Sequence, residues 1–128
     1  MWKQAKEALE TAGYTLKAGD EALLRLCAEY AEAGLLCECN LTDLPQELHH
    51  VCALRAIGAF FSTKQAFMPE DIENFPAEAL ERLKLGDTEV TFDASGARQS
   101  AEQHMSVLVA GLLHYGRELA ACCRRLPW

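Results

Sequence analysis

The stretch that most constrains the fold of this chain covers residues 45–63 and reads PQELHHVCALRAIGAFFST. Within it, every position from 51 to 61 is apolar or small except Arg55. A helix that is apolar nearly all round is buried by neighbours on several sides. These 11 residues are too few to span a bilayer, which needs about 20. The sequence therefore predicts a buried central helix on which other helices pack.

The start of this helix is marked by residues that favour helix N-termini. Thr42 or Asp43 can accept hydrogen bonds from the free N–H groups of the first turn. Pro45 is tolerated in that turn, and the charge of Glu47 is favourable at the positive end of the helix dipole. We therefore expect the helix to begin close to Pro45.

The composition is that of one folded domain, which we expect to cover residues 1–128. Half of the residues are hydrophobic and 24% are charged, unlike the composition of a disordered chain. The net charge of −7 argues against a surface that grips nucleic acid or anionic lipid, although DNA can pass nearby without being held. The first residues, MWKQAKEALETAGY, lack the apolar segment and the cleavage site of a signal peptide.

The chain also contains six cysteines, which in a small secreted protein would indicate disulfides. Without a secretion signal we expect reduced thiols in a cytosolic protein. The cysteines are Cys27, Cys37, Cys39, Cys52, Cys122 and Cys123.

Two helices are predicted before the central one. The first is short and amphipathic and stops at Gly13, and its apolar residues are Trp2, Ala5, Leu9 and Ala12. The second begins at Asp20, which we expect to cap it. The apolar residues of the second helix that we expect to face the central helix are Leu23, Leu26, Cys27, Tyr30, Gly34 and Cys37.

A loop and a β-hairpin are predicted after the central helix. Residues 65–79 contain two prolines and several acids without a sustained period, which is typical of a loop. In the following stretch, RLKLGDTEVTF, apolar and polar positions alternate on both sides of a Gly-Asp pair that can form a two-residue turn. An isolated hairpin is only marginally stable in water, so we expect this one to pack on the helices or to pair with another strand or subunit. Its apolar residues are Leu83, Leu85, Val90 and Phe92.

The last helix, predicted from Ser100 to Pro127, has the cleanest helical period in the sequence. Its apolar positions are Ala101, Met105, Leu108, Leu112, Tyr115, Leu119 and Cys122. Together these elements predict a mainly α fold. We expect a small helical bundle of three main helices and a short N-terminal helix, with a β-hairpin inserted before the last helix.

Cysteines and histidines near the central helix suggest a metal site. The candidate ligands are Cys37, Cys39, His49, His50, Cys52, Cys122 and Cys123. Structural zinc sites usually take their thiolates from knuckles in which two to four residues separate the cysteines. A C-x-C at a helix end, followed by adjacent histidines on a helix, does not match that pattern. We therefore predict no metal and no cofactor, and we interpret Cys27 and Cys52 as small core residues.

No catalytic arrangement stands out either. Glu47-x-x-His50 resembles half of a di-iron motif, which needs a second such pair on a facing helix. That pair is missing, because neither His104 nor His114 follows a glutamate at the required spacing. The sequence contains no G-x-S-x-G motif and no glycine-rich phosphate loop, so we predict that the protein is not an enzyme.

The charges are unevenly distributed along the chain. Residues 62–95 carry eight acids and three bases, which indicates either a solvated loop or an acidic surface around the hairpin. The C-terminal end is instead basic and aromatic and reads RRLPW. Arg and Trp are enriched at protein interfaces, so Arg124, Arg125 and Trp128 are candidates for docking, although a terminal Trp can also fill a core.

The order of these pieces resembles the head–tail connector, or adaptor, family of tailed bacteriophages and prophages. A D-E-x-L-L helix opens at Asp20, and the next helix starts L-P-x-E-L at residues 44–48 and continues into R-A-I-G-A-F-F. The hairpin LKLGDTEVTF, a Ser/Gly turn, the last helix and the basic end RRLPW follow in that order. The resemblance covers about residues 6–128, and the six cysteines belong to no pattern of the family.

The resemblance implies a non-enzymatic structural protein of the virion. Members of the family form a ring of about a dozen copies beneath the portal protein, held by heterologous contacts that close on themselves. The ring joins the head to the tail, and DNA passes through its lumen without sequence-specific contact. The implied partners are other copies of the chain, the portal protein and tail or stopper proteins, with no membrane. The implied location is the virion, reached from the cytoplasm of the host bacterium.

The hairpin and the C-terminal end are the parts of the chain that we expect to contact neighbouring subunits or the portal. The expected interface residues are Leu83, Leu85, Val90, Phe92, Arg124, Arg125 and Trp128. A second hypothesis, which rests on the cysteine spacing, is a small cytosolic helical regulator that uses zinc or thiols. Its ligands would be Cys37, Cys39, Cys52 and either His49 or His50.

Overall fold

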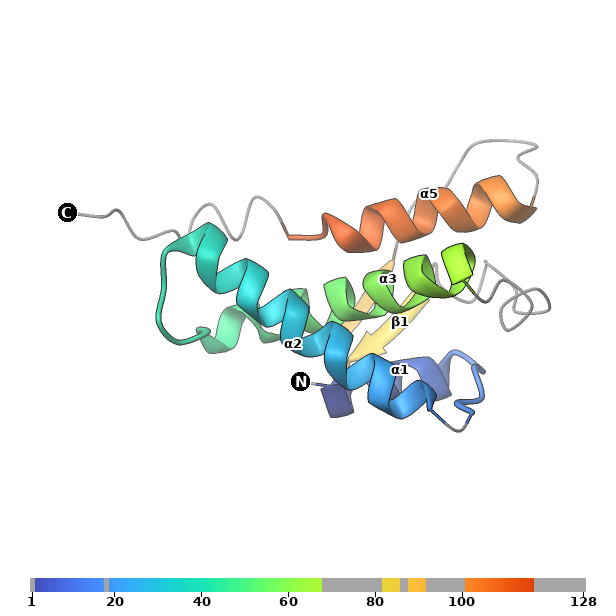
Figure 1. Cartoon of the computed structure of the whole chain (residues 1–128), viewed down its shortest axis with the longest axis horizontal. Coiled ribbons are helices and arrows are strands. Elements are labelled where there is room, and N and C mark those ends of the chain that lie inside the picture. The colour runs from blue at the N-terminus through green and yellow to red at the C-terminus, as the bar shows by residue number, and fades with distance from the viewer. Residues whose placement is uncertain (1, 18, 68–81, 86–87, 92–100, 117–128) are drawn as a thin grey trace.

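A computed structural model shows helices arranged around one central helix (Figure 1). It describes residues 2–17, 19–67, 82–85, 88–91 and 101–116. The predicted mainly α fold, a small helical bundle, is confirmed. The elements in chain order are α1 (Trp2–Thr11), α2 (Asp20–Cys39), a 3-10 turn (Gln46–Leu48), α3 (His49–Phe67), β1 (Arg82–Leu85), β2 (Thr88–Thr91) and α5 (Ala101–Leu113).

The central helix is α3, and its predicted burial is confirmed. Helices α1, α2 and α5 all pack against it, with α5 on one side and α1 on the other (Figure 1). Phe60 and Phe61 are fully buried, and their rings meet the ring of Tyr14 edge to face at 5.7 and 5.5 Å between centroids. Burial of each phenylalanine contributes about 2–3 kcal/mol to the stability of the fold. The contact of both rings with Tyr14 holds the segment between α1 and α2 against the core.

The start of α3 differs from the predicted one. Pro45 occupies the cap position of the 3-10 turn that leads into α3, with φ −61° and ψ 149°. No side chain in the described part of the chain caps that turn, so the expected capping by Thr42 or Asp43 is wrong. The carbonyl of Pro45 accepts a hydrogen bond from the Leu48 N–H at 3.0 Å, and the fixed φ of proline sets the chain direction.

The inward face of α2 also differs from the predicted one. Leu26 and Tyr30 were expected to face α3, whereas they are 62% and 77% exposed. Only Cys27 of the predicted stripe is buried, and two of the residues that do face inward are alanines. Small side chains at the contact let two helices approach closely, as the 3.8 Å between Cys52 Sγ and the Ala28 carbonyl shows. The buried residues of α2 are Asp20, Leu24, Cys27, Ala28, Ala31, Leu35 and Cys39.

Helix α5 lies very close to α3. A Cβ added to Gly58 would lie 2.8 Å from the Cβ of Leu112 and 2.9 Å from the backbone nitrogen of Leu113. α5 ends at Leu113, so the prediction that this helix continues to Pro127 is wrong. Gly116 adopts a φ of +74°, which glycine tolerates and which terminates helices. A Cβ on Gly116 would lie 2.5 Å from a methyl carbon of Val51, so the close approach also requires glycine.

Two short strands precede α5 in the sequence. β1 and β2 pair antiparallel, with Leu83 opposite Val90 and Leu85 opposite Thr88, and β1 lies beside α1. Gly86, Asp87 and Phe92 lie outside the described residues, so the hairpin as a whole stays a prediction.

Within residues 2–17, 19–67 and 101–116, no helix combines the length and the apolar character that crossing a membrane requires.

Candidate interaction surface

An apolar stripe runs along an exposed face of α2, roughly a third of a turn from the face that packs on α3. Leu26 and Tyr30 are its largest exposed members, and they lie four residues apart, on neighbouring turns. Leu23 is half-buried, while Gly34 and Cys37 are exposed and continue the same helical spacing. We call these five residues the α2 stripe. Because α2 is apolar on two faces, packing on α3 leaves one of them in contact with solvent.

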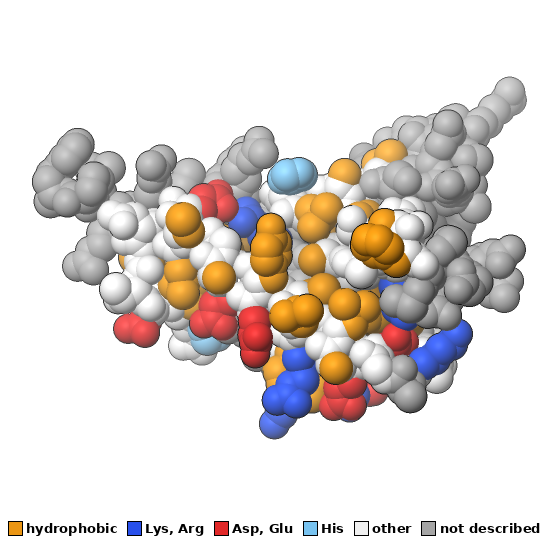
Figure 2. Space-filling view, viewed as in Figure 1, with side chains coloured by type: hydrophobic (Ala, Val, Ile, Leu, Met, Phe, Trp, Pro, Cys, Tyr) orange, Lys and Arg blue, Asp and Glu red, His pale blue; other side chains and the backbone are white. Residues whose placement is uncertain are grey.

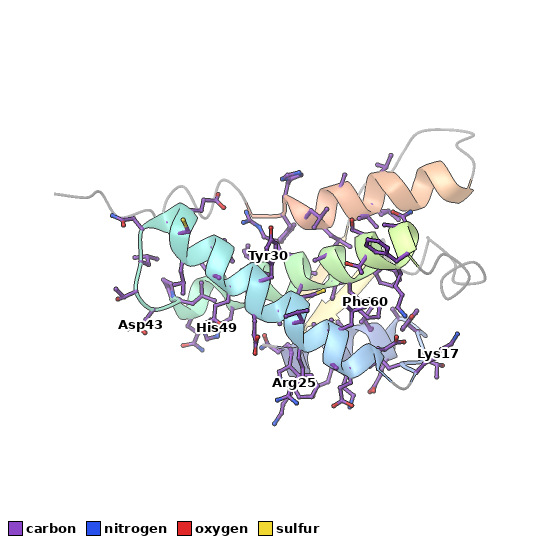
Figure 3. All side chains as sticks on the ribbon, viewed as in Figure 1. Lys17, Arg25, Tyr30, Asp43, His49 and Phe60 are labelled. Carbon is purple, nitrogen blue, oxygen red and sulfur yellow. The ribbon has the colours of Figure 1, made fainter. Side chains whose placement is uncertain are left out.

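Exposed apolar residues also occur outside α2. Figure 2 shows hydrophobic side chains gathered across the middle of the face on which α2 lies in front, with charged side chains along its lower edge. Figure 3 shows Tyr30 projecting from the middle of α2, with Arg25 on the lower edge of the helix. Val107 of α5 and Phe67 at the end of α3 are also exposed, at 45% and 78%. Exposed apolar side chains that lie together, as Leu26 and Tyr30 do, are typical of surfaces that bind another protein segment.

The charged side chains of α2 lie outside the α2 stripe. Glu29 is exposed and lies three residues from Leu26, whereas Glu32 is half-buried on the side of α2 toward Cys52 of α3. Arg25 is the basic exception, and its Cζ lies 4.8 Å from the centroid of the Trp2 ring, which draws it toward α1. The last turn of α2 contains Glu38 and no basic residue, and a helix C-terminus carries negative partial charge. The end of α2 therefore carries negative partial charge, and the carboxylate of Glu38 is paired with Arg55.

Arg55 joins the C-terminal ends of α2 and α5. Its Nε donates a hydrogen bond to the carbonyl of Tyr115 at 2.9 Å, and its Nη1 lies 2.9 Å from Oε2 of Glu38. The ring of Tyr115 also meets the ring of His50 at 6.1 Å between centroids. Since Arg55 is the one charged residue in the apolar stretch of α3, its role is to hold the end of α5 beside the last turn of α2.

A buried ion pair holds the opposite end of α2. Lys64 Nζ lies 2.6 Å from Oδ1 of Asp20, and the two side chains are only 1% and 6% exposed. The other carboxylate oxygen of Asp20 accepts hydrogen bonds from the Lys17 N–H at 2.9 Å and from the Tyr14 hydroxyl at 3.4 Å. These bonds satisfy the charges, so removal of either partner would leave an uncompensated charge in the core.

The prediction that Asp20 caps α2 is wrong. Gly19 occupies the cap position with a φ of 90°, and the described residues provide no side-chain cap there. The sequence signal that was missed is Lys64, a basic residue on α3 just beyond its apolar stretch.

The interface residues predicted from the sequence are only partly placed. Leu83, Leu85 and Val90 lie on the paired strands, where the structure describes the backbone alone. Phe92, Arg124, Arg125 and Trp128 lie outside the described residues. The predicted interface therefore stays a prediction. The sequence analysis missed Leu26 and Tyr30 as exposed residues, and the signal for them was the second apolar face of α2.

The residues of the zinc or thiol hypothesis do not come together. Cys37 is exposed, whereas Cys39 and Cys52 are buried in the core. Among the described residues, no group of three or more His, Cys, Asp or Glu side chains could hold a metal ion. Burial, with a smaller contribution from the charge of Glu32, raises the pKa of the Cys52 thiol to about 11. Metal binding and thiol chemistry both need the thiolate, so Cys52 is a poor candidate for either.

Comparison of the chain with models of protein families, with curated proteins and with solved structures finds no match.

Proposed function

We propose that this chain is a structural subunit that assembles with copies of itself into a ring, joining the head of a tailed bacteriophage or prophage to its tail. The observation that carries the proposal is the apolar surface left exposed on a single chain. Leu26, Tyr30 and Phe67 each expose more than half of their area, and Val107 exposes 45%. Burial of such side chains against a neighbour contributes about 1.5–3 kcal/mol each.

The presence of exposed apolar residues on two different helices is compatible with a ring. The α2 stripe and Val107 lie on separate helices that both pack against α3. A contact between two different surfaces of identical subunits is heterologous, and such contacts close into rings when the rotation between subunits allows it. The strand pair adds to this argument, because a two-stranded sheet gains stability from pairing with a further strand.

The net charge of −7 is compatible with the passage of DNA through such a ring. An acidic wall repels the phosphate backbone and prevents tight non-specific binding. In this proposal the portal protein and tail or stopper proteins bind the two ends of the ring, and the subunit travels from the host cytoplasm into the virion. The expected contacts with these partners are the hairpin and the C-terminal residues Arg124, Arg125 and Trp128.

The proposal is tested by placing a charge on the exposed apolar surface. Tyr30→Asp and Val107→Asp should leave the helical content and the unfolding midpoint nearly unchanged, because both side chains are exposed. Both variants should fail to form rings on portal particles viewed by electron microscopy. Gln4→Asp, an exposed polar position on α1, is the matched control and should assemble normally. Normal assembly of both apolar-surface variants would contradict the proposal.

A further inference from the structure

We propose that two ion pairs select which of the two apolar faces of α2 packs on α3, and so keep the α2 stripe exposed. The buried face contains two leucines and two alanines, whereas the stripe contains two leucines and a tyrosine. The two faces therefore offer comparable apolar area, and burial of apolar area alone does not decide between them. This inference concerns the fold of a single chain, so it is independent of the proposed ring.

The charged residues of α3 are both paired with acids of α2. Helix α3 contains two basic residues, Arg55 and Lys64, and no acid. Lys64 lies 2.6 Å from Asp20, and Arg55 lies 2.9 Å from Glu38. Asp20 and Glu38 are the first and last acids of α2, and their spacing corresponds to about five full turns, so both lie on the same side of the helix. The two pairs therefore fix the rotation of α2 about its own axis at both of its ends.

The alternative arrangement is a rotation of α2 that brings the α2 stripe onto α3. Such a rotation covers roughly a third of a turn and moves a side chain that reaches about 5–6 Å from the helix axis by about 9–10 Å. Lys64, which is 1% exposed, would then stay in the core without the carboxylate of Asp20, which is strongly unfavourable. Asp20 would also lose the hydrogen bonds from the Lys17 N–H and the Tyr14 hydroxyl.

The pair at the other end of α2 opposes the same rotation. Arg55 cannot follow a moving Glu38, because its Nε donates a hydrogen bond to the carbonyl of Tyr115 at 2.9 Å. Glu38 is 44% exposed, so this pair contributes less than the buried one. The selection therefore rests mainly on Asp20 and Lys64, and its result is that Tyr30 stays available to a partner.

The test measures the oxidation of single side chains by hydroxyl radicals in the full chain, mapped by mass spectrometry. In the wild type we expect Tyr30, 77% exposed, to be oxidised and Leu35, fully buried, to be protected. Removal of both ion pairs should let the two arrangements coexist, so that oxidation of Tyr30 falls about twofold and Leu35 becomes oxidised. The variant that removes both pairs carries Asp20→Ala, Glu38→Gln, Arg55→Met and Lys64→Met.

The matched control is the double variant Lys6→Met, Glu21→Gln. It removes an exposed pair between α1 and α2 at 3.7 Å and should keep the wild-type oxidation of Tyr30 and Leu35. Phe60, fully buried on α3, reports folding, because it is oxidised only when the chain unfolds. A four-site variant with Phe60 protected and with unchanged oxidation of Tyr30 and Leu35 would overturn the inference.

A milder variant decides the outcome if the four-site variant unfolds. Asp20→Ala, Lys64→Met keeps the pair of Arg55 and should show oxidation of Leu35 above the wild-type level. Complete protection of Leu35 in this variant would overturn the inference. Unfolding of both variants would also overturn it, because the pairs would then stabilise the only arrangement of α2 instead of selecting one of two. All samples are dilute and contain no portal, so the result does not depend on ring formation.

Discussion

The ammonium group of Lys64 lies 2.6 Å from the carboxylate of Asp20, although 44 positions separate the two residues in the sequence. The pair joins the first residue of α2 to the last turn of α3. Both side chains are almost fully buried, and Lys64 Nζ also lies 5.5 Å from the centroid of the Phe60 ring. Each charge therefore depends on the other for its stability in the core.

Removal of one member of this pair should strongly destabilise the fold. Lys64→Met leaves a buried carboxylate without its counter-charge, which we expect to lower the free energy of unfolding in urea by about 3–5 kcal/mol. The double variant Asp20→Asn, Lys64→Met should recover much of that loss, because no uncompensated charge remains. Lys6→Met removes a surface pair with Glu21 at 3.7 Å and should change stability by less than about 1 kcal/mol. Additive effects of the two core substitutions would contradict the predicted coupling.

Two helical glycines should respond to alanine in opposite directions. Gly58→Ala would bring a Cβ within 2.8 Å of Leu112 and should destabilise the protein by about 1–3 kcal/mol, because α5 must move away from α3. Gly34→Ala meets no atom within 4 Å and should stabilise it by about 0.4–1 kcal/mol through the higher helix propensity of alanine. Thermal unfolding of the two variants checks both signs. A stabilising Gly58→Ala would show that the two helices are not in close contact.

Arg55 should control the local stability of the end of α5. Arg55→Met removes the hydrogen bond to the Tyr115 carbonyl and the ion pair with Glu38, and should cost about 1.5–3 kcal/mol. Hydrogen exchange of residues 112–116 should become faster relative to that of the rest of the core. Glu38→Gln keeps the bond to Tyr115 and is the matched control with a smaller effect. Equal protection of residues 112–116 in Arg55→Met and the wild type would count against this role.

The buried thiol of Cys52 should make the protein less stable in alkali. Burial raises the pKa of this thiol from 9.0 to about 11, so the unfolded chain loses the proton at lower pH than the folded one. The contribution of the neutral thiol to stability is fully present below pH 9.0 and is lost as the pH rises through about 11. Over that interval Cys52→Ala should lose less stability than the wild type, by up to roughly 3 kcal/mol. Urea unfolding across the interval checks this.

The buried centre of the fold could be predicted from the sequence because α3 is apolar on every side. Any arrangement of the neighbouring helices buries such a segment, so its burial could be predicted without knowing which of its faces each neighbour contacts. α2 is different, because Leu24 and Leu35 form one apolar face while Leu26 and Tyr30 form another. Helical spacing alone cannot decide which face packs on α3. The alanines of the inward face permitted the closer contact, and Tyr30 was left exposed.

The parts of the candidate surface that depend on contacts between distant residues could not be predicted. Asp20 precedes an apolar helix and fits the pattern of a cap, and only the folded bundle places Lys64 beside it. Gly116 likewise looks like an ordinary position in a periodic helix. The proximity of Val51 and the φ of +74° at Gly116 show why α5 ends before it.

The most direct test of the central claim is native mass spectrometry of the full chain, alone and with the portal protein of the same phage or prophage. We expect a closed ring of about a dozen chains when the portal is present, held by heterologous contacts. Charge on the exposed apolar surface, as in Tyr30→Asp, should reduce the assembly to single chains. A chain that stays monomeric in the presence of the portal, or that forms only a two-fold dimer, would contradict the proposed ring assembly.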